Sequence, residues 1–405
     1  TICAYSPGIC RLASGRLVAT IDLGGAGVAD FDGEKCGASL MRIPFQGRIY
    51  TSDDHGRTWT ERAAFPFMHA RPFAAGQAVY VLGQARDLHV IRSGDGGETW
   101  SAPAKLSDGQ KWHQAPSNVH YANGCVYLVM ERRGAAKCKG WNISENVPVL
   151  MRAKVDSDLT QRDSWTFASA KTFCDIVPDR EMEWHGLPFY PAWYPEWHAA
   201  APGRGCAPSG WLETNVVQFI DPDHLWHDPA GKTFHLWARA HTGFTGYACV
   251  LKVTEQGERP GTGEMVTEFQ AAPSDKKMLY VPCPGGQMKF HLLYDDETRL
   301  FWLLSTQATD SMTRADRLPP KRFGLPDNER RRLQLHFSKN MIDWCFAGLV
   351  ATGPADNASR HYASMVIDGE DLHVLSRSGD ENAKNAHDGN LITFHTVTDF
   401  RRLVY

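Results

Sequence analysis

An eight-residue pattern occurs twice in the first hundred residues of this chain. "SDDHGRTW" spans residues 52–59, "SGDGGETW" spans residues 93–100, and both read S-x-D-x-G-x-T-W. The serine starts a turn, the aspartate can accept hydrogen bonds from backbone amides ahead of it, and the glycine supplies a positive φ. The tryptophan then folds back as an apolar plug. Each copy predicts a rigid hairpin between two outer strands, and the repetition predicts repeated sheets.

Weaker copies of the pattern and a set of short apolar strands extend this repeat along the chain. "SKNMIDW" at residues 338–344 keeps the serine and tryptophan, and "SDLTQRDSW" at residues 157–165 is a fainter copy. Six strands rich in β-branched and aromatic residues each follow a turn containing Gly, Asp or Glu: "GRLVATIDL", "GQAVYVLGQ", "GCVYLVMER", "KTFHLWARA", "TRLFWLLST" and "EDLHVLSRS". Almost no segment has a helical period, so the sequence predicts an all-β fold.

We interpret the pattern as a six-bladed β-propeller that forms a single domain over residues 1–405. A closed ring of sheets leaves no long exposed edge. The predicted blades span residues 6–63, 64–106, 107–170, 211–270, 279–352 and 359–403. Two long insertions, 171–210 and 306–330, interrupt them, and loops of this length usually carry function or are disordered. The first contains "EWHGLPFYPAWYPEWH", whose aromatic rings suit either the wall of a sugar pocket or a cover over the side of the propeller.

Composition excludes several classes of partner. The formal net charge of -3 gives no general attraction to nucleic acid or to an anionic membrane. No apolar run has the length of a membrane span, no C-x-x-C spacing indicates a structural zinc site, and we expect neither a metal nor a cofactor. No signal peptide pattern begins at Thr1, and the compartment and oligomeric state stay open.

With these repeats in place, the chain resembles the sialidase (neuraminidase) superfamily, whose Asp-boxes are hairpins of the kind quoted above. In that superfamily a Glu precedes a Val-Val strand and an Arg ends the next strand, and "LETNVVQFIDPDHLWHDPAGKTFHLWARAH" has Glu213 and Arg239 at those places. An Arg lies shortly before an Asp-box strand, and "ERRRLQLHFSKN" supplies Arg330, with Arg332 as a rival. A Tyr precedes an apolar strand ending in Asp-Gly, and "RHYASMVIDGEDL" supplies Tyr362.

The first blade departs from the superfamily pattern. Tyr5-Ser6 in "AYSPGICRLASGRLVA" stand where the superfamily has Arg-Ile, so the first arginine of its carboxylate-binding triad is missing. "MRIPF" at residues 41–45 is out of place, which makes Arg42 a poor substitute. Four other arginines could restore the triad: Arg71, Arg132, Arg360 and Arg377.

The resemblance implies a retaining glycosidase with a tyrosine nucleophile. Tyr362 would be the nucleophile, Glu213 would accept its proton, and Arg239 with Arg330 would bind a carboxylate through planar, bidentate contacts. The acid/base residue belongs on the loop before the first octapeptide, where Asp32 is our candidate ahead of Asp30. The predicted function is exo-acting removal of a terminal acidic sugar, a sialic, nonulosonic or uronic acid, from a glycan.

Two other classes of function stay open. His69, His113 and His361 lie near predicted starts of inner strands, where they would suit a polysaccharide lyase or a histidine-dependent glycosidase acting on uronate. A propeller can also bind carbohydrate without catalysis, and the polar segment 375–390 could either bind hydroxyls or form a turn. Fold alone does not decide among these classes.

Overall fold

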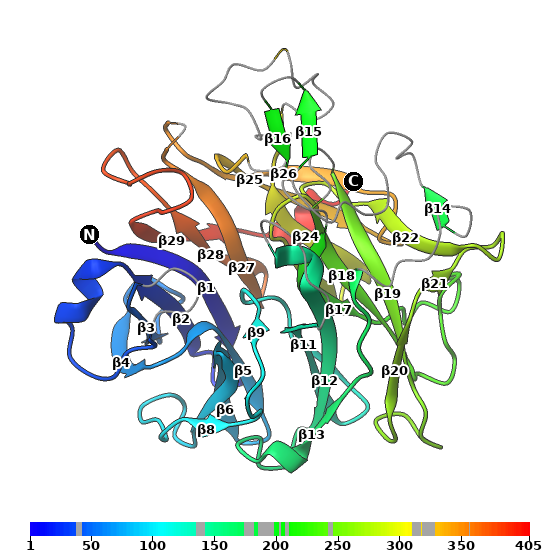
Figure 1. Ribbon diagram of the computed structural model, residues 1–405, viewed down its shortest axis with the longest axis horizontal. Coiled ribbons are helices and arrows are strands. Elements are labelled where there is room, and N and C mark those ends of the chain that lie inside the picture. The colour runs from blue at the N-terminus through cyan, green and yellow to red at the C-terminus, as the bar shows by residue number, and fades with distance from the viewer. Residues whose placement is uncertain are drawn as a thin grey trace.

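The computed structural model describes residues 1–37, 43–134, 142–173, 182–184, 198–201, 204–206, 210–241, 246–309, 317, 329–355 and 357–405. Six sheets, antiparallel except for the pair β14–β22, follow one another around a ring, so the predicted six-bladed β-propeller is confirmed (Figure 1). Most of the two predicted insertions, residues 171–210 and 306–330, lies outside the described residues. In the part of the chain that is described, no helix is long and apolar enough to cross a membrane.

The blades are built from consecutive strands. Blade 1 contains β1 (Cys3–Arg11), β2 (Leu17–Gly24), β3 (Phe45–Ser52) and β4 (Thr60–Phe65). Blade 2 contains β5 (Met68–Ala75), β6 (Ala78–Ala85), β7 (Asp87–Ser93) and β8 (Ala104–Lys105). Blade 3 contains β9 (Trp112–His113), β10 (His120–Ala122), β11 (Cys125–Arg133), β12 (Asn146–Lys154) and β13 (Trp165–Phe167).

The second half of the ring has the same organisation. Blade 4 contains β14 (Met182–Trp184), β17 (Gly210–Val217), β18 (Thr233–His241), β19 (Tyr247–Glu255), β20 (Met265–Glu268), β21 (Gln270–Ala271) and β22 (Lys277–Pro282). Blade 5 contains β23 (His291–Asp295), β24 (Leu300–Thr306), β25 (Arg332–Ser338) and β26 (Cys345–Thr352). Blade 6 contains β27 (Arg360–Asp368), β28 (Asp371–Ser378) and β29 (Leu391–Val397).

A few short elements lie outside these blades. They are the pair β15 (His198–Ala201) and β16 (Arg204–Cys206), and the 3-10 helices η1 (Ala26–Asp30), η2 (Asn142–Glu145), η3 (Arg162–Ser164) and η8 (Phe400–Leu403).

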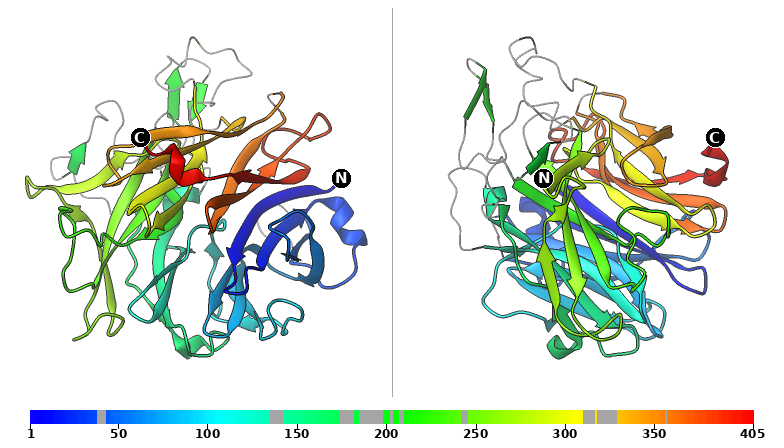
Figure 2. Two further views of the ribbon diagram at one scale, coloured as in Figure 1. Left: turned by 180° about the vertical axis from the view of Figure 1, so that it is seen from behind. Right: turned by 90° about the vertical axis from the view of Figure 1, so that its right-hand side faces the viewer.

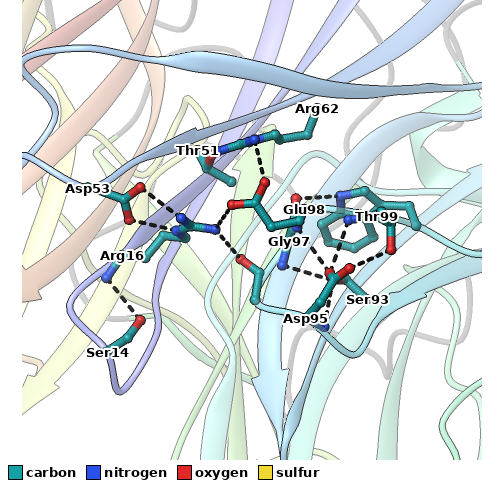
Figure 3. Close-up of polar contacts among 12 residues, drawn as sticks. Ser14, Arg16, Thr51, Asp53, Arg62, Ser93, Asp95, Gly97, Glu98 and Thr99 are labelled. Atoms are coloured by element: carbon teal, nitrogen blue, oxygen red, sulfur yellow. Dashed lines mark hydrogen bonds and ion pairs between the residues drawn. The ribbon is translucent and has the colours of Figure 1, made fainter.

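The octapeptide turns join the third and fourth strands of blades 1 and 2. In the second turn the Ser93 hydroxyl donates to Asp95 (2.7 Å) and accepts from the Gly97 amide (2.8 Å) (Figure 3). Asp95 in turn accepts from the Thr99 amide (3.0 Å), and the Trp100 indole donates to the Gly97 carbonyl (3.1 Å). The first turn repeats these bonds, with the Thr58 amide 2.8 Å from Asp54 and the Trp59 indole 3.0 Å from the Gly56 carbonyl. Both copies therefore form the hairpin that the repeated sequence predicts.

Apolar contacts between neighbouring blades form the core, and they are smallest where the ring closes. Blades 3 and 4 share a cluster that includes Trp211, Phe234 and Tyr280. The buried residues between blades 6 and 1 are Ile9, Leu17, Ala19 and Leu375. The first and last strands of the chain do not share a sheet, and β1 instead lies beside β27 and β28 (Figures 1 and 2). An ion pair between Arg11 and Asp368 (2.5 Å) also crosses this seam.

Candidate functional site

Three inner strands of the ring carry the same backbone distortion. In β5, β17 and β27 one non-glycine residue has a positive φ: His69 (54°), Glu213 (58°) and Tyr362 (49°). Each lies where the pairing with the next strand shifts register, and the shifts fall between Met68 and Arg71, Leu212 and Asn215, and His361 and Ser364. Such bulges re-aim side chains, and each strained residue costs about 1–3 kcal/mol. Repetition of this strain on three blades indicates a site that they build together.

Glu213 and Tyr362, far apart in the chain, meet at one arginine. Arg239 on β18 donates from Nη1 to the Tyr362 hydroxyl (2.8 Å) and to Glu213 Oε2 (3.1 Å). Its Nε donates to the Gln287 carbonyl (2.7 Å), which fixes the guanidinium plane. Glu213 is 2% exposed and Arg239 is 3% exposed, so each buried charge is compensated by the other.

The electrostatics of this cluster keep Tyr362 neutral until a base acts on it. Burial raises the pKa of the Tyr362 phenol above its usual value, Arg239 opposes the shift, and Glu213 adds to it. Glu213 also hydrogen-bonds the phenol. The arrangement places a carboxylate acceptor and a cation at the same oxygen, which are the two groups needed to make a weak nucleophile reactive.

Two more arginines face the Tyr362 ring. The guanidinium carbon of Arg330 lies 5.5 Å from the ring centroid, and that of Arg377 on β28 lies 5.4 Å from it. Arg377 also stacks over Tyr5, 4.3 Å from that ring centroid. Tyr5 is the residue that stands where the sialidase pattern has an arginine, so a guanidinium from another blade occupies the neighbourhood of the missing one.

The other arginines considered from the sequence lie elsewhere. Arg71 lines a cavity of ≈ 160 Å³ together with Ser117 and His291, and donates to the Val129 carbonyl (3.1 Å). Arg332 pairs with Glu329 (2.7 Å). Arg360 binds the carbonyls of Ser359 (2.7 Å) and Gly379 (2.9 Å). Arg42 lies outside the described residues, and among the residues that are described Arg132 on β11 makes no hydrogen bond or ring contact with Tyr362.

The predicted histidines take different places around the cluster. His361 is fully buried and accepts a hydrogen bond from Arg330 (2.8 Å), so it positions that arginine. His69 and His113 are half-buried, and their ring centroids lie 5.2 Å apart. Gln84 donates to Nδ1 of His69 (2.8 Å), which leaves its proton on Nε2. Burial lowers the pKa of both imidazoles, that of His113 to about 4, so both are neutral bases at pH 7.

Asp32, the predicted acid/base residue, lies on an exposed loop. Its backbone carbonyl accepts a hydrogen bond from the Gln46 side chain (2.7 Å). Within the described ranges, which omit residues 38–42, no hydrogen bond or ion pair joins its carboxylate to Tyr362 or Glu213. Its catalytic role stays a prediction.

The Tyr5 hydroxyl donates to Asp388 (3.2 Å), which lies in the polar segment 375–390. One residue that the sequence patterns did not point to, Asp22, also belongs to this region. Asp22 on β2 is buried and accepts from the strained His69 amide (2.7 Å). Burial raises the pKa of Asp22 to about 7 despite opposing backbone hydrogen bonds. An aspartate inside the apolar strand "ATIDL" is the signal by which Asp22 could have been found.

Comparison with solved structures supports the fold. A Hadza microbial sialidase matches 98% of this chain with a TM-score of 0.53 at 14% identity, and the Trypanosoma rangeli sialidase matches 99% with 0.50 at 13%. A protein of unknown function from Dyadobacter fermentans matches 98% with 0.52 at 12% identity. The matches cover 66%, 56% and 95% of those chains, respectively. The chain therefore shares the propeller fold of these sialidases and spans less than two thirds of their length.

Comparison by sequence adds no family. No protein-family model matches the chain, and no curated protein matches it.

Proposed function

We propose that this chain is an exo-acting glycoside hydrolase that removes a terminal acidic sugar from a glycan. The observation that carries the proposal is the buried contact of Arg239 with both Tyr362 and Glu213. A non-catalytic binding surface has no need for a strained tyrosine beside a buried carboxylate. The likeness of the fold to that of two proteins named as sialidases points the same way.

The proposed reaction has two steps. Tyr362 Oη attacks the anomeric carbon and passes its proton to Glu213, while Asp32 protonates the departing glycosidic oxygen. In the second step Asp32 removes a proton from water, the water oxygen attacks the anomeric carbon, and Tyr362 leaves and recovers its proton from Glu213. A neutral phenol approaches an anionic sugar with less repulsion than a carboxylate would, which is the reason for a tyrosine here.

The acidic group of the sugar would be bound by Arg239, Arg330 and Arg377. Planar guanidinium groups bind carboxylates through paired, charge-assisted hydrogen bonds. We call these three arginines the arginine clamp. Arg377 comes from β28 and lies over Tyr5, so one of the three guanidinium groups comes from a different strand than in the sialidase pattern. A uronic acid or an unusual nonulosonic acid suits this altered clamp as well as an ordinary sialic acid does.

A second candidate function, a polysaccharide lyase, is favoured by the pair His69 and His113. Both imidazoles are neutral at pH 7. Because Nδ1 of His69 already accepts from Gln84, His113 would be the base that removes the C5 proton of a uronate while a cation neutralises the carboxylate. The two functions yield different products, so one experiment separates them.

The test compares wild type with Tyr362→Phe on two substrate sets. Aryl glycosides of sialic and uronic acids report hydrolysis by released phenol, and uronate-rich polysaccharides report elimination by absorbance of the unsaturated product. We expect phenol release by wild type and a fall of at least about 10³-fold in Tyr362→Phe, because the nucleophile is lost.

A matched control is Tyr50→Phe. Tyr50 donates to Glu61 (2.9 Å) and Glu61 pairs with Arg48, which repeats the three residue types on the surface of blade 1. This variant should keep full activity. Formation of unsaturated product by wild type would contradict the proposed hydrolase function and favour the lyase. If neither substrate set gives a product, a non-catalytic carbohydrate-binding propeller is favoured.

A further inference from the structure

A second polar cluster lies at the opposite end of the strand that carries Tyr362. β27 ends at Asp368, six residues and therefore roughly 20 Å from Tyr362. Oδ2 of Asp368 faces Nδ1 of His55 (2.6 Å) and Nε2 of His373 (3.2 Å). The three atoms all lie within 4.8 Å of one another. His55 belongs to the first octapeptide turn and the other two residues to blade 6, so the cluster spans the seam of the ring.

The composition and spacing of this cluster suit one kind of ion. Two imidazole nitrogens and one carboxylate oxygen are donors preferred by zinc and related divalent metals, whereas calcium and magnesium prefer oxygen alone. Tetrahedral zinc with bonds of about 2.0–2.1 Å holds its ligand atoms about 3.3 Å apart. The 3.2 Å between Asp368 Oδ2 and His373 Nε2 matches this separation. The 2.6 Å between Asp368 Oδ2 and His55 Nδ1 would have to lengthen by about 0.7 Å, which the exposed His55 side chain allows.

Further contacts orient two of these ligands. His373 Nδ1 lies 3.1 Å from the Thr396 hydroxyl, so Nε2 is directed at the carboxylate. Asp368 Oδ1 accepts from Arg11 Nε (2.5 Å), which leaves Oδ2 directed at both imidazoles. Metal sites in proteins commonly hold their ligands in this way through a hydrogen bond on the atom that does not bind the ion. Asp368 and His373 are buried, while the His55 side chain is 66% exposed, so an ion can enter from solvent.

We propose that His55, Asp368 and His373 bind one zinc-class divalent ion that links the first blade to the last. The fourth position of the ion would hold water on the exposed side of His55. The link has a physical purpose, because blades 1 and 6 share only a small apolar cluster. Binding to the closed ring but not to the unfolded chain stabilises the closed ring.

The test uses the whole protein after removal of metal with a chelator and dialysis. We expect wild type to take up one zinc ion per chain and to melt about 3 °C higher at a free zinc concentration roughly 100 times Kd. Cobalt in place of zinc should give visible d–d absorption without a thiolate charge-transfer band, which excludes binding by free cysteines such as Cys10 and Cys345.

Single variants assign the site. His55→Gln removes the exposed ligand with little risk to the fold, and both it and His373→Gln should abolish the stoichiometric ion and the thermal shift. His395→Gln is the control, because it alters another half-buried histidine of blade 6 and should bind as wild type does. Absence of zinc uptake by wild type, uptake unchanged in His55→Gln, or a thiolate band would each overturn the proposal. None of these readouts depends on glycosidase activity.

Discussion

The octapeptide turns and the candidate site are organised in opposite ways. Every turn bond described above joins residues no more than four positions apart, as between Asp95 and Thr99. In the site, Arg239 reaches Glu213 across 26 positions and Tyr362 across 123 positions. Asp95 of the second turn is exposed and Asp54 of the first turn is half-buried, whereas Glu213 and Asp22 in the site region are buried. The octapeptide turns therefore form through bonds between residues close in the sequence. The candidate site forms only after the fold has brought distant strands together.

If the turns specify the fold and the candidate site performs the chemistry, a substitution in the site should give the largest loss of activity while the protein stays folded. Glu213→Gln removes the proposed base while keeping the shape of the side chain. We expect kcat to fall by about 10²–10⁴-fold, with a cooperative unfolding transition retained. Kinetics and thermal melting of the purified variant measure the two effects. Glu61→Gln, at the surface Tyr–Glu pair, is the control and should keep wild-type kcat; an equal loss in both variants would break the comparison.

A substitution in the first octapeptide turn should do the opposite, lowering stability while leaving substrate preference unchanged. The Trp59 ring packs against Phe394, 5.7 Å between centroids, in the seam between blades 1 and 6. Trp59→Ala should lower the free energy of unfolding by about 2–4 kcal/mol, since a large apolar contact is lost. Denaturant unfolding measures this loss. Substrate preference at a temperature where the variant is folded should not change, and a changed preference would mean that the turn contributes to the site.

A smaller loss of activity than in Glu213→Gln is expected when Arg377, one of the three clamp arginines, is replaced. Arg377→Gln removes a charged donor, which corresponds to about 1.5–3 kcal/mol, or about 10–150-fold in KM for an acidic substrate. A neutral sugar analogue without the carboxylate should bind no worse to the variant than to wild type. Arg360→Gln changes a nearby arginine that binds backbone carbonyls and serves as the control. Equal losses for acidic and neutral substrates would remove Arg377 from the clamp.

The smallest effect, counted for each pH unit, is in the pH dependence of stability, where Asp22 and Asp54 should have opposite signs. Burial raises the pKa of Asp22 to about 7, so its unfavourable contribution develops as pH rises from about 4 to about 7. Hydrogen bonds from Thr58 lower the pKa of Asp54 to about 2, so its favourable contribution is present above about pH 4 and is lost as pH falls toward 2.

Urea unfolding across this pH range tests the pair. Asp22→Asn should gain stability relative to wild type as pH rises to 7, by up to about 1.4 kcal/mol for each unit of pKa shift. Asp54→Asn should be less stable than wild type at pH 6 and approach it near pH 2. The same sign of pH dependence in both variants would contradict the assigned environments.

The sequence alone determined the repeated turns and the six sheets, because both depend on short-range patterns. Glycine and aspartate at set positions specify the turn, and alternation of apolar residues specifies a strand. The resemblance to sialidases also selected Glu213, Arg239, Arg330 and Tyr362 from the chain, and the structure brings these four together.

The tertiary structure decided what no local pattern contains. It brought Arg377 over Tyr5, although 372 positions separate them (377 minus 5), and it placed Arg71 beside a cavity that Tyr362 does not line. It also gathered His55, Asp368 and His373 at the seam, where the ligands lie too far apart in sequence to form a spacing motif. The physical reason is closure of the ring: the strand bulges aim side chains toward a shared axis, and the seam joins the two ends of the chain, so these contacts exist only once all six blades are in place.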